Sequence, residues 1–178
     1  LQHLLDKYGD GRRTEIVAAA GEFNMEDLIE DEPCVVTITK SGYIKRLSVD
    51  TFRVQRRGGK GVSGGSLKDD EDFVSQMFTA TNHQYLLNFT NHGKIFWLKV
   101  YDIPEGSRIS RGKHLANVLN LAKDEHITAV IPVREFREDQ FLLMATLQGQ
   151  VKKTALAAYG NPRAGGIKGI KLSDGDEL

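Results

Sequence analysis

The 178-residue sequence lacks the features of secreted, disulfide-bonded and membrane-spanning proteins. Its single cysteine, Cys34, excludes an internal disulfide and is typical of a reducing compartment. Its longest apolar runs, such as residues 141–145, fall well short of the roughly 20 residues that a membrane helix needs. No basic segment followed by an apolar one opens the sequence at Leu1, so no signal peptide is predicted. We therefore predict a cytoplasmic protein and expect this chain to be part of a longer one.

Signals for a metal, a nucleotide or a catalytic centre are also missing. The five histidines and the one cysteine do not fall at metal-ligand spacings, so no metal site is predicted. The segment from Gly106 to Lys113 is one residue too long for a phosphate-binding loop, and His114 stands where that motif needs serine or threonine. Neither a Ser/His/Asp arrangement nor a pair of carboxylates can be argued from the pattern. We therefore predict no cofactor and no catalytic residue within this chain.

Charge of one sign is not in excess, because 24 Lys and Arg balance 24 Asp and Glu, but the charges are sorted along the chain. Residues 1–34 carry nine acids and three bases. Three later segments are basic. Residues 40–68 carry eight bases and one acid, residues 92–115 carry five bases and two acids, and residues 147–171 carry five bases and no acid. Zero net charge excludes a uniformly basic nucleic-acid coat, whereas three basic blocks at similar spacing predict a patterned basic surface.

Three segments repeat the pattern of an apolar strand, a turn glycine and a second strand. They are residues 35–47, 85–97 and 141–153, with turn glycines Gly42, Gly93 and Gly149. The turn glycines are 51 and 56 residues apart, and each segment is predicted to form a β-hairpin. A glycine-rich basic loop follows each hairpin, at residues 55–61, 110–113 and 163–169. Residues 78–81 and 127–133 are further strand candidates.

About four strands per repeat, with a period near the roughly 50 residues of a kelch blade, predict an all-β, propeller-like fold. We expect three four-stranded blades, at residues 34–75, 76–125 and 126–178. Trp97 and its apolar neighbours are expected in the core of a blade.

The first 33 residues follow a different pattern. Gln2–Tyr8 has helical periodicity that ends at Gly9, so residues 1–33 are expected to be the end of a helical domain and a linker. The acidic stretches Glu26-Asp27 and residues 69–72 are expected in solvated loops, where they could compete with DNA for a basic surface.

The loop after the first hairpin carries a distinctive motif. Its residues Gln55-Arg56-Arg57-Gly58-Gly59-Lys60-Gly61 resemble the seven-residue box that marks the A subunits of bacterial DNA gyrase. Residues 7–16 are similar to the end of the coiled-coil region in that family, and the Thr-x-x-Gly hairpin turns resemble those of its C-terminal domain. The resemblance implies a six-bladed β-pinwheel, of which three blades are visible here. In the paralogous topoisomerase IV protein the box is typically eroded, so an intact box favours gyrase, with the topoisomerase IV domain as the alternative.

The same resemblance implies a function. It implies sequence-nonspecific binding, bending and chiral wrapping of duplex DNA in support of ATP-dependent negative supercoiling. The family's catalytic tyrosine belongs to a region before Leu1, so the fragment alone is expected to be non-catalytic. ATP and Mg²⁺ are expected on other parts of an A2B2 complex with the B subunit of gyrase.

The chemistry of the basic loops fits phosphate contact. In the box, three glycines allow close backbone approach, and Arg56, Arg57 and Lys60 can grip phosphate oxygens. The matching positions after the second and third hairpins add five candidates: Arg108, Arg111, Lys113, Arg163 and Lys168. Nothing in these loops reads base edges, so contact with the DNA backbone is predicted. A propeller-type interaction module whose basic rim binds an acidic protein is the alternative from a different class.

Overall fold

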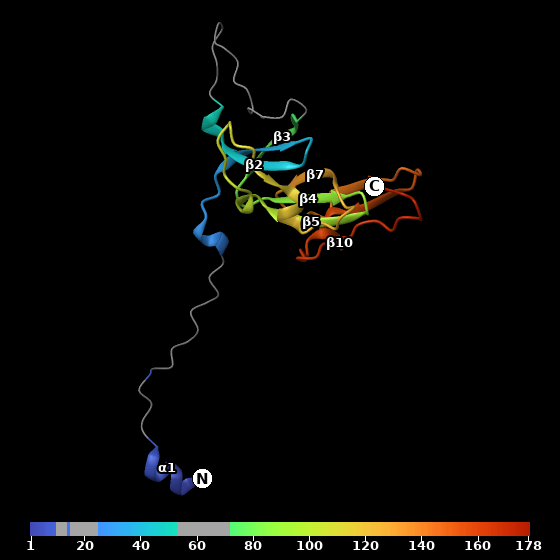
Figure 1. Cartoon of the computed structure of the whole chain (residues 1–178). Coiled ribbons are helices and arrows are strands. Elements are labelled where there is room, and N and C mark those ends of the chain that lie inside the picture. The colour runs from blue at the N-terminus through green and yellow to red at the C-terminus, as the bar shows by residue number, and fades with distance from the viewer. Residues whose placement is uncertain (10–13, 15–24, 53–71) are drawn as a thin grey trace.

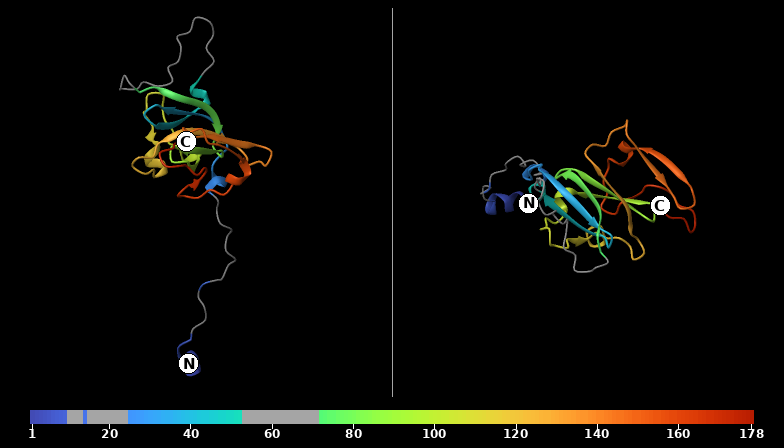
Figure 2. Two further views of the ribbon diagram at one scale, coloured as in Figure 1. Left: turned by 90° about the vertical axis from the view of Figure 1, so that its right-hand side faces the viewer. Right: turned by 90° about the horizontal axis from the view of Figure 1, so that it is seen from above.

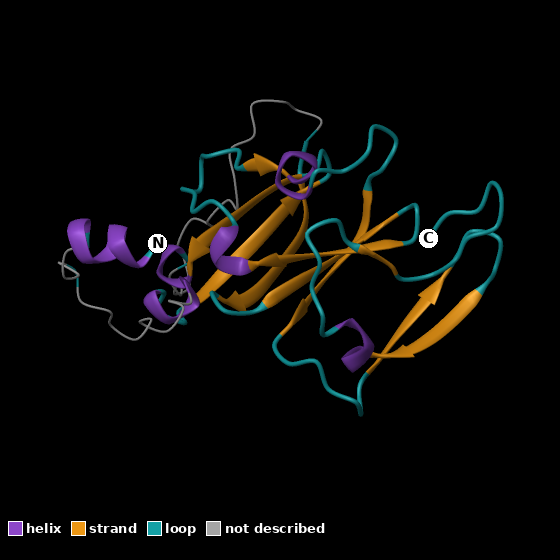
Figure 3. Cartoon of the chain, turned by 90° about the horizontal axis from the view of Figure 1, so that it is seen from below, coloured by secondary structure: helices purple, strands orange, loops and turns teal. Residues whose placement is uncertain are grey.

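The computed structural model describes residues 1–9, 14, 25–52 and 72–178, and the described chain is mostly β (Figure 1). The strands are β1 Pro33–Thr39, β2 Tyr43–Ser48, β3 Val74–Thr81, β4 Tyr85–Thr90, β5 Lys94–Lys99, β6 Lys113–His114, β7 Ile127–Val133, β8 Phe141–Ala145, β9 Val151–Ala155 and β10 Ile167–Lys168. The helices are α1 Gln2–Tyr8 and α2 Leu115–Leu119, with single 3₁₀ turns η1 Met25–Leu28, η2 Val49–Thr51, η3 Val100–Asp102 and η4 Leu156–Tyr159. Figure 3 shows these short helices outside the sheets.

The three predicted hairpins are confirmed as the antiparallel pairs β1–β2, β4–β5 and β8–β9. Their turn glycines have positive φ angles of 81°, 69° and 84° at Gly42, Gly93 and Gly149. Each of these glycines donates its backbone N–H to the carbonyl of the threonine three residues earlier, at 2.9 Å. The predicted strands at 78–81 and 127–133 lie in β3 and β7.

The sheets are not built from contiguous repeats. The first sheet has the order β3-β1-β2-β6 and the second β10-β5-β4-β7, while β8 and β9 form a two-stranded sheet within the described residues. We call the first two sheets blade one and blade two. The expected ranges 34–75, 76–125 and 126–178 therefore do not coincide with the sheets, because both edge strands of each four-stranded sheet lie wholly or mostly in the following range: β3 and β6 flank β1 and β2, and β7 and β10 flank β4 and β5. Strand exchange of this kind ties neighbouring blades together.

The sheets follow one another in chain order, as the blue, green and orange-red parts of the right-hand view in Figure 2 show. One core lies between blades one and two and contains Val36, Ile44, Leu86 and Leu98. A second core lies between blade two and β8–β9, with Leu87 among its members. Because successive strand residues point to opposite faces, Leu86 and Leu87 fill different cores, which explains why β4 is buried on both faces.

The prediction that Trp97 and its neighbours lie in the core holds for Ile95, Phe96 and Leu98, whereas Trp97 itself is only partly buried. It packs against the second core, and its indole Nε1 donates to the carbonyl of Tyr159 at 2.9 Å. The outer face of β8–β9 is not packed against another sheet in the described residues, and three of its apolar side chains are exposed: Phe141, Leu143 and Val151.

The predicted N-terminal helix forms as α1 and ends at Gly9, with its residues exposed. None of the helices in the described residues combines the length and the apolar character that crossing a membrane requires.

Candidate nucleic-acid interface

The predicted DNA-binding residues fall in three loops, of which the structure describes two. The box at residues 55–61 lies outside the described residues, so its role stays a prediction. The blade-one loop, residues 103–113, runs from η3 into β6, and the blade-two loop, residues 160–168, runs from η4 into β10. Because β6 pairs with β2 and β10 with β5, the two loops reach equivalent edges of consecutive blades.

A glycine lets each loop approach its blade closely. Gly112 has φ +88°, and a Cβ there would overlap the carbonyl oxygen of Ile44. Gly166 has φ +70°, and a Cβ there would lie 2.8 Å from the carbonyl oxygen of Ile95. Ile44 and Ile95 both stand two residues after a turn glycine, so the same contact is repeated on the two blades.

The five candidate cations of these loops are exposed, three on blade one (Arg108, Arg111 and Lys113) and two on blade two (Arg163 and Lys168). The guanidinium of Arg111 lies 4.1 Å from the centroid of the Tyr43 ring, a cation–π distance that orients this side chain. Within the described part of the chain, the side chains of Arg108 and Lys113 form no ion pair or hydrogen bond with protein groups.

Two cations that the sequence places in the first basic block point inward instead. Lys45 is buried, and burial lowers the pKa of its ammonium. Arg46 donates from Nε to the carbonyl of Ile103 at 2.9 Å and from Nη1 to Oδ1 of Asn82 at 3.0 Å. Both side chains thus support the blade-one loop, because their partners lie in that loop or beside it. A count of charges along the sequence does not distinguish such supporting cations from exposed ones.

A buried carboxylate caps each hairpin turn, a feature that the sequence-based predictions missed. Asp72, Glu125 and Asp176 are 8%, 6% and 7% exposed. Oδ1 of Asp72 accepts the backbone N–H of Ser41 at 3.0 Å, and Oδ1 of Asp176 accepts that of Gln148 at 2.8 Å. The expectation that residues 69–72 form a solvated loop is therefore wrong for Asp72. The spacing of these acids, 53 and 51 residues, was the available signal.

The second hairpin is bonded through a side chain instead, because Oε1 of Glu125 accepts the hydroxyl of Thr90, the residue that opens the turn, at 2.8 Å. Burial acts to raise the pKa of each carboxyl, but these hydrogen bonds hold all three pKa values below the ordinary range. The carboxylates are therefore charged turn caps at neutral pH.

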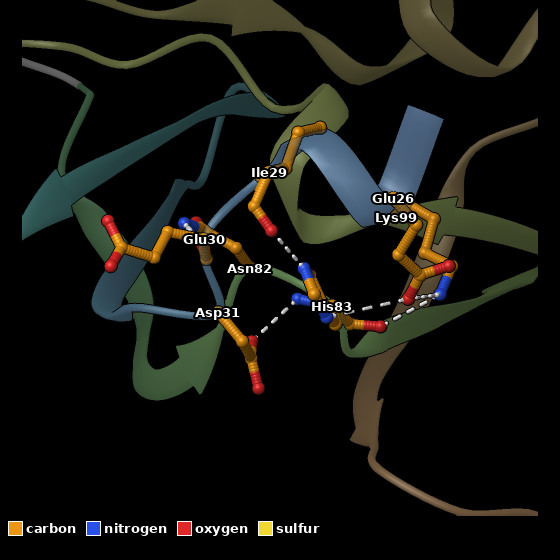
Figure 4. Close-up of polar contacts among 7 residues, drawn as sticks. All are labelled: Glu26, Ile29, Glu30, Asp31, Asn82, His83 and Lys99. Carbon is orange, nitrogen blue, oxygen red and sulfur yellow. Dashed lines mark hydrogen bonds and ion pairs between the residues drawn. The ribbon is translucent and has the colours of Figure 1, made fainter. Parts of the chain in front are cut away.

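The described part of the acidic linker keeps exposed acids such as Asp27 but is attached to the sheets (Figure 4). Lys99 donates to Oε1 of Glu26 at 2.8 Å, so the expectation of a solvated loop is wrong for Glu26. The His83 ring contacts the carbonyl of Ile29 at 2.6 Å, and the backbone N–H of His83 donates to Asp31 at 2.9 Å. These contacts hold the linker on β5 and on the turn between β3 and β4, neither of which carries any of the five candidate cations.

A metal site is not formed by the described residues, since they contain no group of three or more His, Cys, Asp and Glu side chains that could hold an ion. The exposed charged groups of the two loops are the guanidinium and ammonium groups of the five candidates and the carboxylate of Glu105; the cations outnumber it, and their natural ligands are anions such as phosphate.

Comparison with known proteins identifies the fold. The family model for the DNA gyrase C-terminal domain, a beta-propeller, matches residues 35–81, 84–134 and 140–178. The chain belongs to this family. Each matched segment contains one hairpin, which confirms the three predicted repeats and the resemblance to the A subunit of gyrase.

The curated relatives agree with the family model. The A subunit of DNA gyrase from Neisseria gonorrhoeae is 48% identical over all 178 residues, which cover 19% of that protein. The A subunit of DNA gyrase from Salmonella typhimurium is 45% identical over the same length, which covers 20% of it. The chain thus spans about a fifth of the length of these relatives.

Solved structures share the architecture. The C-terminal domain of DNA topoisomerase IV matches with a TM-score of 0.70 and 31% identity, over 84% of this chain and 45% of that one. The DNA gyrase A C-terminal domain matches with a TM-score of 0.61 and 29% identity, over 82% of this chain and 45% of that one. These matches confirm the predicted pinwheel-type, mostly β fold.

Proposed function

We propose that this chain binds duplex DNA without sequence specificity and wraps it as part of a bacterial DNA gyrase. The observation that carries the proposal is the repeated placement of cationic loops on equivalent edges of blades one and two. Arg108, Arg111 and Lys113 lie on one blade, and Arg163 and Lys168 on the next. Side chains of this kind contact phosphates, and phosphate contacts position DNA without reading its sequence.

Spreading the contacts over consecutive blades suits bent DNA. DNA is stiff over about 150 base pairs, and bending a 20–30 base-pair site by 40–90° costs on the order of 1–6 kcal/mol. Contacts from a single loop would not follow such a curve, whereas loops on successive blades can offset the bending energy along it. In this proposal the box at residues 55–61 adds its cations to the same surface.

The remaining parts of the reaction are assigned to the rest of the enzyme. We propose that the parent is an A2B2 complex, that the B subunit binds ATP with Mg²⁺, and that the strand-breaking tyrosine lies in another region of the A subunit. This chain then contributes the wrapped DNA segment and its handedness to negative supercoiling in the bacterial cytoplasm.

The DNA contacts are tested by replacing the five described cations with alanine in the full-length protein. We expect weaker binding to every duplex sequence and a shallower dependence of log K on log salt, by roughly 0.9 for each phosphate contact that the substitutions remove. An unchanged salt slope, together with retained binding of an acidic peptide by the wild type, would instead favour the protein-interaction alternative.

Wrapping is tested separately from binding with Arg56, Arg57 and Lys60 replaced by alanine in the reconstituted enzyme. We expect negative supercoiling to be lost while simple DNA binding, ATP-dependent relaxation and decatenation persist, since the other loops still contact phosphates. Equal loss of supercoiling and relaxation would contradict a wrapping role of the box.

A further inference from the structure

Lys45 occupies an unusual position for a lysine. It lies on β2 with only 4% of its surface exposed, beneath the blade-one loop. Its Nζ donates to three carbonyl oxygens of that loop, those of Ser107 at 3.1 Å, Arg108 at 3.0 Å and Ser110 at 2.8 Å. The contacts join residues more than 60 positions apart in the chain.

The geometry uses the full capacity of the ammonium group. A protonated lysine has three donors and no acceptor, and here three carbonyls take them. Burying an ammonium costs free energy that these hydrogen bonds offset, and an apolar side chain at this position would leave the three carbonyls without this donor. The cation therefore has a role beyond packing, and its only protein partners in the described chain are these three carbonyls.

The three hydrogen bonds determine which groups of the loop face outward. Carbonyl oxygens carry partial negative charge and would repel a phosphate if they lay at the loop surface. With three carbonyls turned toward Lys45, the loop presents the exposed side chains of Arg108, Arg111 and Lys113.

Blade two has no such cation at the equivalent position. Three residues after the turn glycine, where blade one has Lys45, blade two has Phe96. A Cβ on Gly166 would lie 3.0 Å from the Phe96 ring, so the blade-two loop rests on an apolar side chain instead. The third hairpin again has a lysine at this position, Lys152, but its Nζ donates to one carbonyl, that of Gly169 at 2.6 Å, so the three-carbonyl contact is found at Lys45 among the described hairpins.

We propose that Lys45 is a positioning residue for DNA contact, which orients the blade-one loop so that its three exposed cations reach consecutive phosphates. The inference rests on the proposed DNA-binding function. It predicts that replacing this buried lysine lowers DNA affinity by more than the loss of its own positive charge would.

The test compares Lys45→Met with Lys40→Met in the full-length protein. Lys40 is an exposed lysine on the same hairpin, so both variants remove one positive charge. We expect Lys40→Met to lower the salt slope by at most about 0.9, the value of one phosphate contact, and Lys45→Met by roughly twice that or more. Equal effects of the two substitutions would overturn the proposal.

Two further measurements separate positioning from general destabilisation. Thermal unfolding is followed for each variant, and the DNA assays are run well below the transition. Trypsin cleavage after Arg108 and Arg111 is expected to accelerate in Lys45→Met but not in Lys40→Met. An unchanged cleavage rate would mean that the loop keeps its conformation without Lys45 and would overturn the proposal.

A third arm distinguishes failure of this inference from failure of the proposed function. In a background with Arg108, Arg111 and Lys113 replaced by alanine, adding Lys45→Met is expected to change DNA affinity less than twofold. If the triple alanine variant itself keeps the wild-type salt slope, the DNA-contact function of this loop fails, and the inference fails with it. If the triple variant weakens binding but Lys45→Met weakens it further in that background, only the positioning role fails.

A milder variant keeps the test decisive if Lys45→Met does not fold. Lys45→Gln places a shorter polar side chain at the site, and its control is Lys40→Gln. We expect the same order of salt slopes, with Lys45→Gln showing the larger loss; equal losses would overturn the proposal.

Discussion

Replacing Glu125 by glutamine should destabilise the 178-residue chain by about 2 kcal/mol at neutral pH. The side chain of Glu125 is 1% exposed. Its Oε1 accepts the Thr90 hydroxyl at 2.8 Å, and its Oε2 accepts the Ala122 backbone N–H at 3.2 Å and the Lys94 ammonium at 3.5 Å. Glutamine keeps one acceptor oxygen, but its amide nitrogen then faces donors, so at least one buried donor loses its partner.

The magnitude follows from the hydrogen bonds that the substitution removes. Bonds to a charged group contribute about 1.5–3 kcal/mol each, and a donor left without a partner adds a penalty of similar size. We take about 2 kcal/mol because Lys94 is partly exposed and can turn to water. For a chain of this length the melting temperature should fall by about 4–8 °C.

The pH dependence of stability should change in a defined direction. Burial opposes ionisation of Glu125, but the hydrogen bonds from Thr90 and Ala122 and the charge of Lys94 hold its pKa below the ordinary value. Its stabilising effect is therefore complete above the unfolded pKa of about 4.3 and is lost as the pH falls through the lower folded pKa. Glutamine does not titrate, so the variant should lose less stability than the wild type between about pH 5 and strongly acidic conditions.

Urea unfolding at a series of pH values measures both effects. Asp124→Asn is the matched control, because Asp124 is the exposed acidic neighbour of Glu125, and it should change the free energy of unfolding by less than about 0.5 kcal/mol. If Glu125→Gln matched this control at neutral pH and kept the wild-type acid slope, the turn-cap reasoning would be refuted.

Other substitutions test packing around the loops. Gly112→Ala should destabilise the chain more than Gly149→Ala, as measured by urea unfolding. Both glycines have positive φ. A Cβ on Gly112 would overlap the Ile44 carbonyl, whereas nothing lies within 4 Å of a Cβ on Gly149. Equal costs would show that only backbone strain matters. Trp97→Phe should cost about 1 kcal/mol, because the carbonyl of Tyr159 loses its indole donor; a melting temperature identical to wild type would contradict this.

The hairpins follow from local physics, which explains why the sequence predicts them well. A Thr-x-x-Gly turn needs positive φ at its last position, and Gly42, Gly93 and Gly149 supply it without steric cost. Apolar strands on both sides of each turn then pair in the one register that the short turn allows. Repetition of this pattern at similar spacing was enough to predict three repeats and a propeller-like fold.

Only the tertiary structure decided which strands share a sheet. β6 and β10 contain two residues each, too few to show a periodicity, and their pairing with β2 and β5 joins segments that are far apart in the chain. Strand exchange between repeats is therefore invisible in the sequence, which shows only contiguous repeats.

The sequence by itself determined the turn glycines, the apolar strands on either side of them, and the presence of cations near the blades, because each of these depends on residue type and near neighbours. The direction in which a charged side chain points depends on partners that are distant in the chain. Lys45 faces inward and Arg108 outward, although both count equally as positive charge, and Asp72 is buried although it follows three other acids. Burial and hydrogen-bond partners arise only when the blades pack together, so only the tertiary structure separates the supporting charges from the exposed ones.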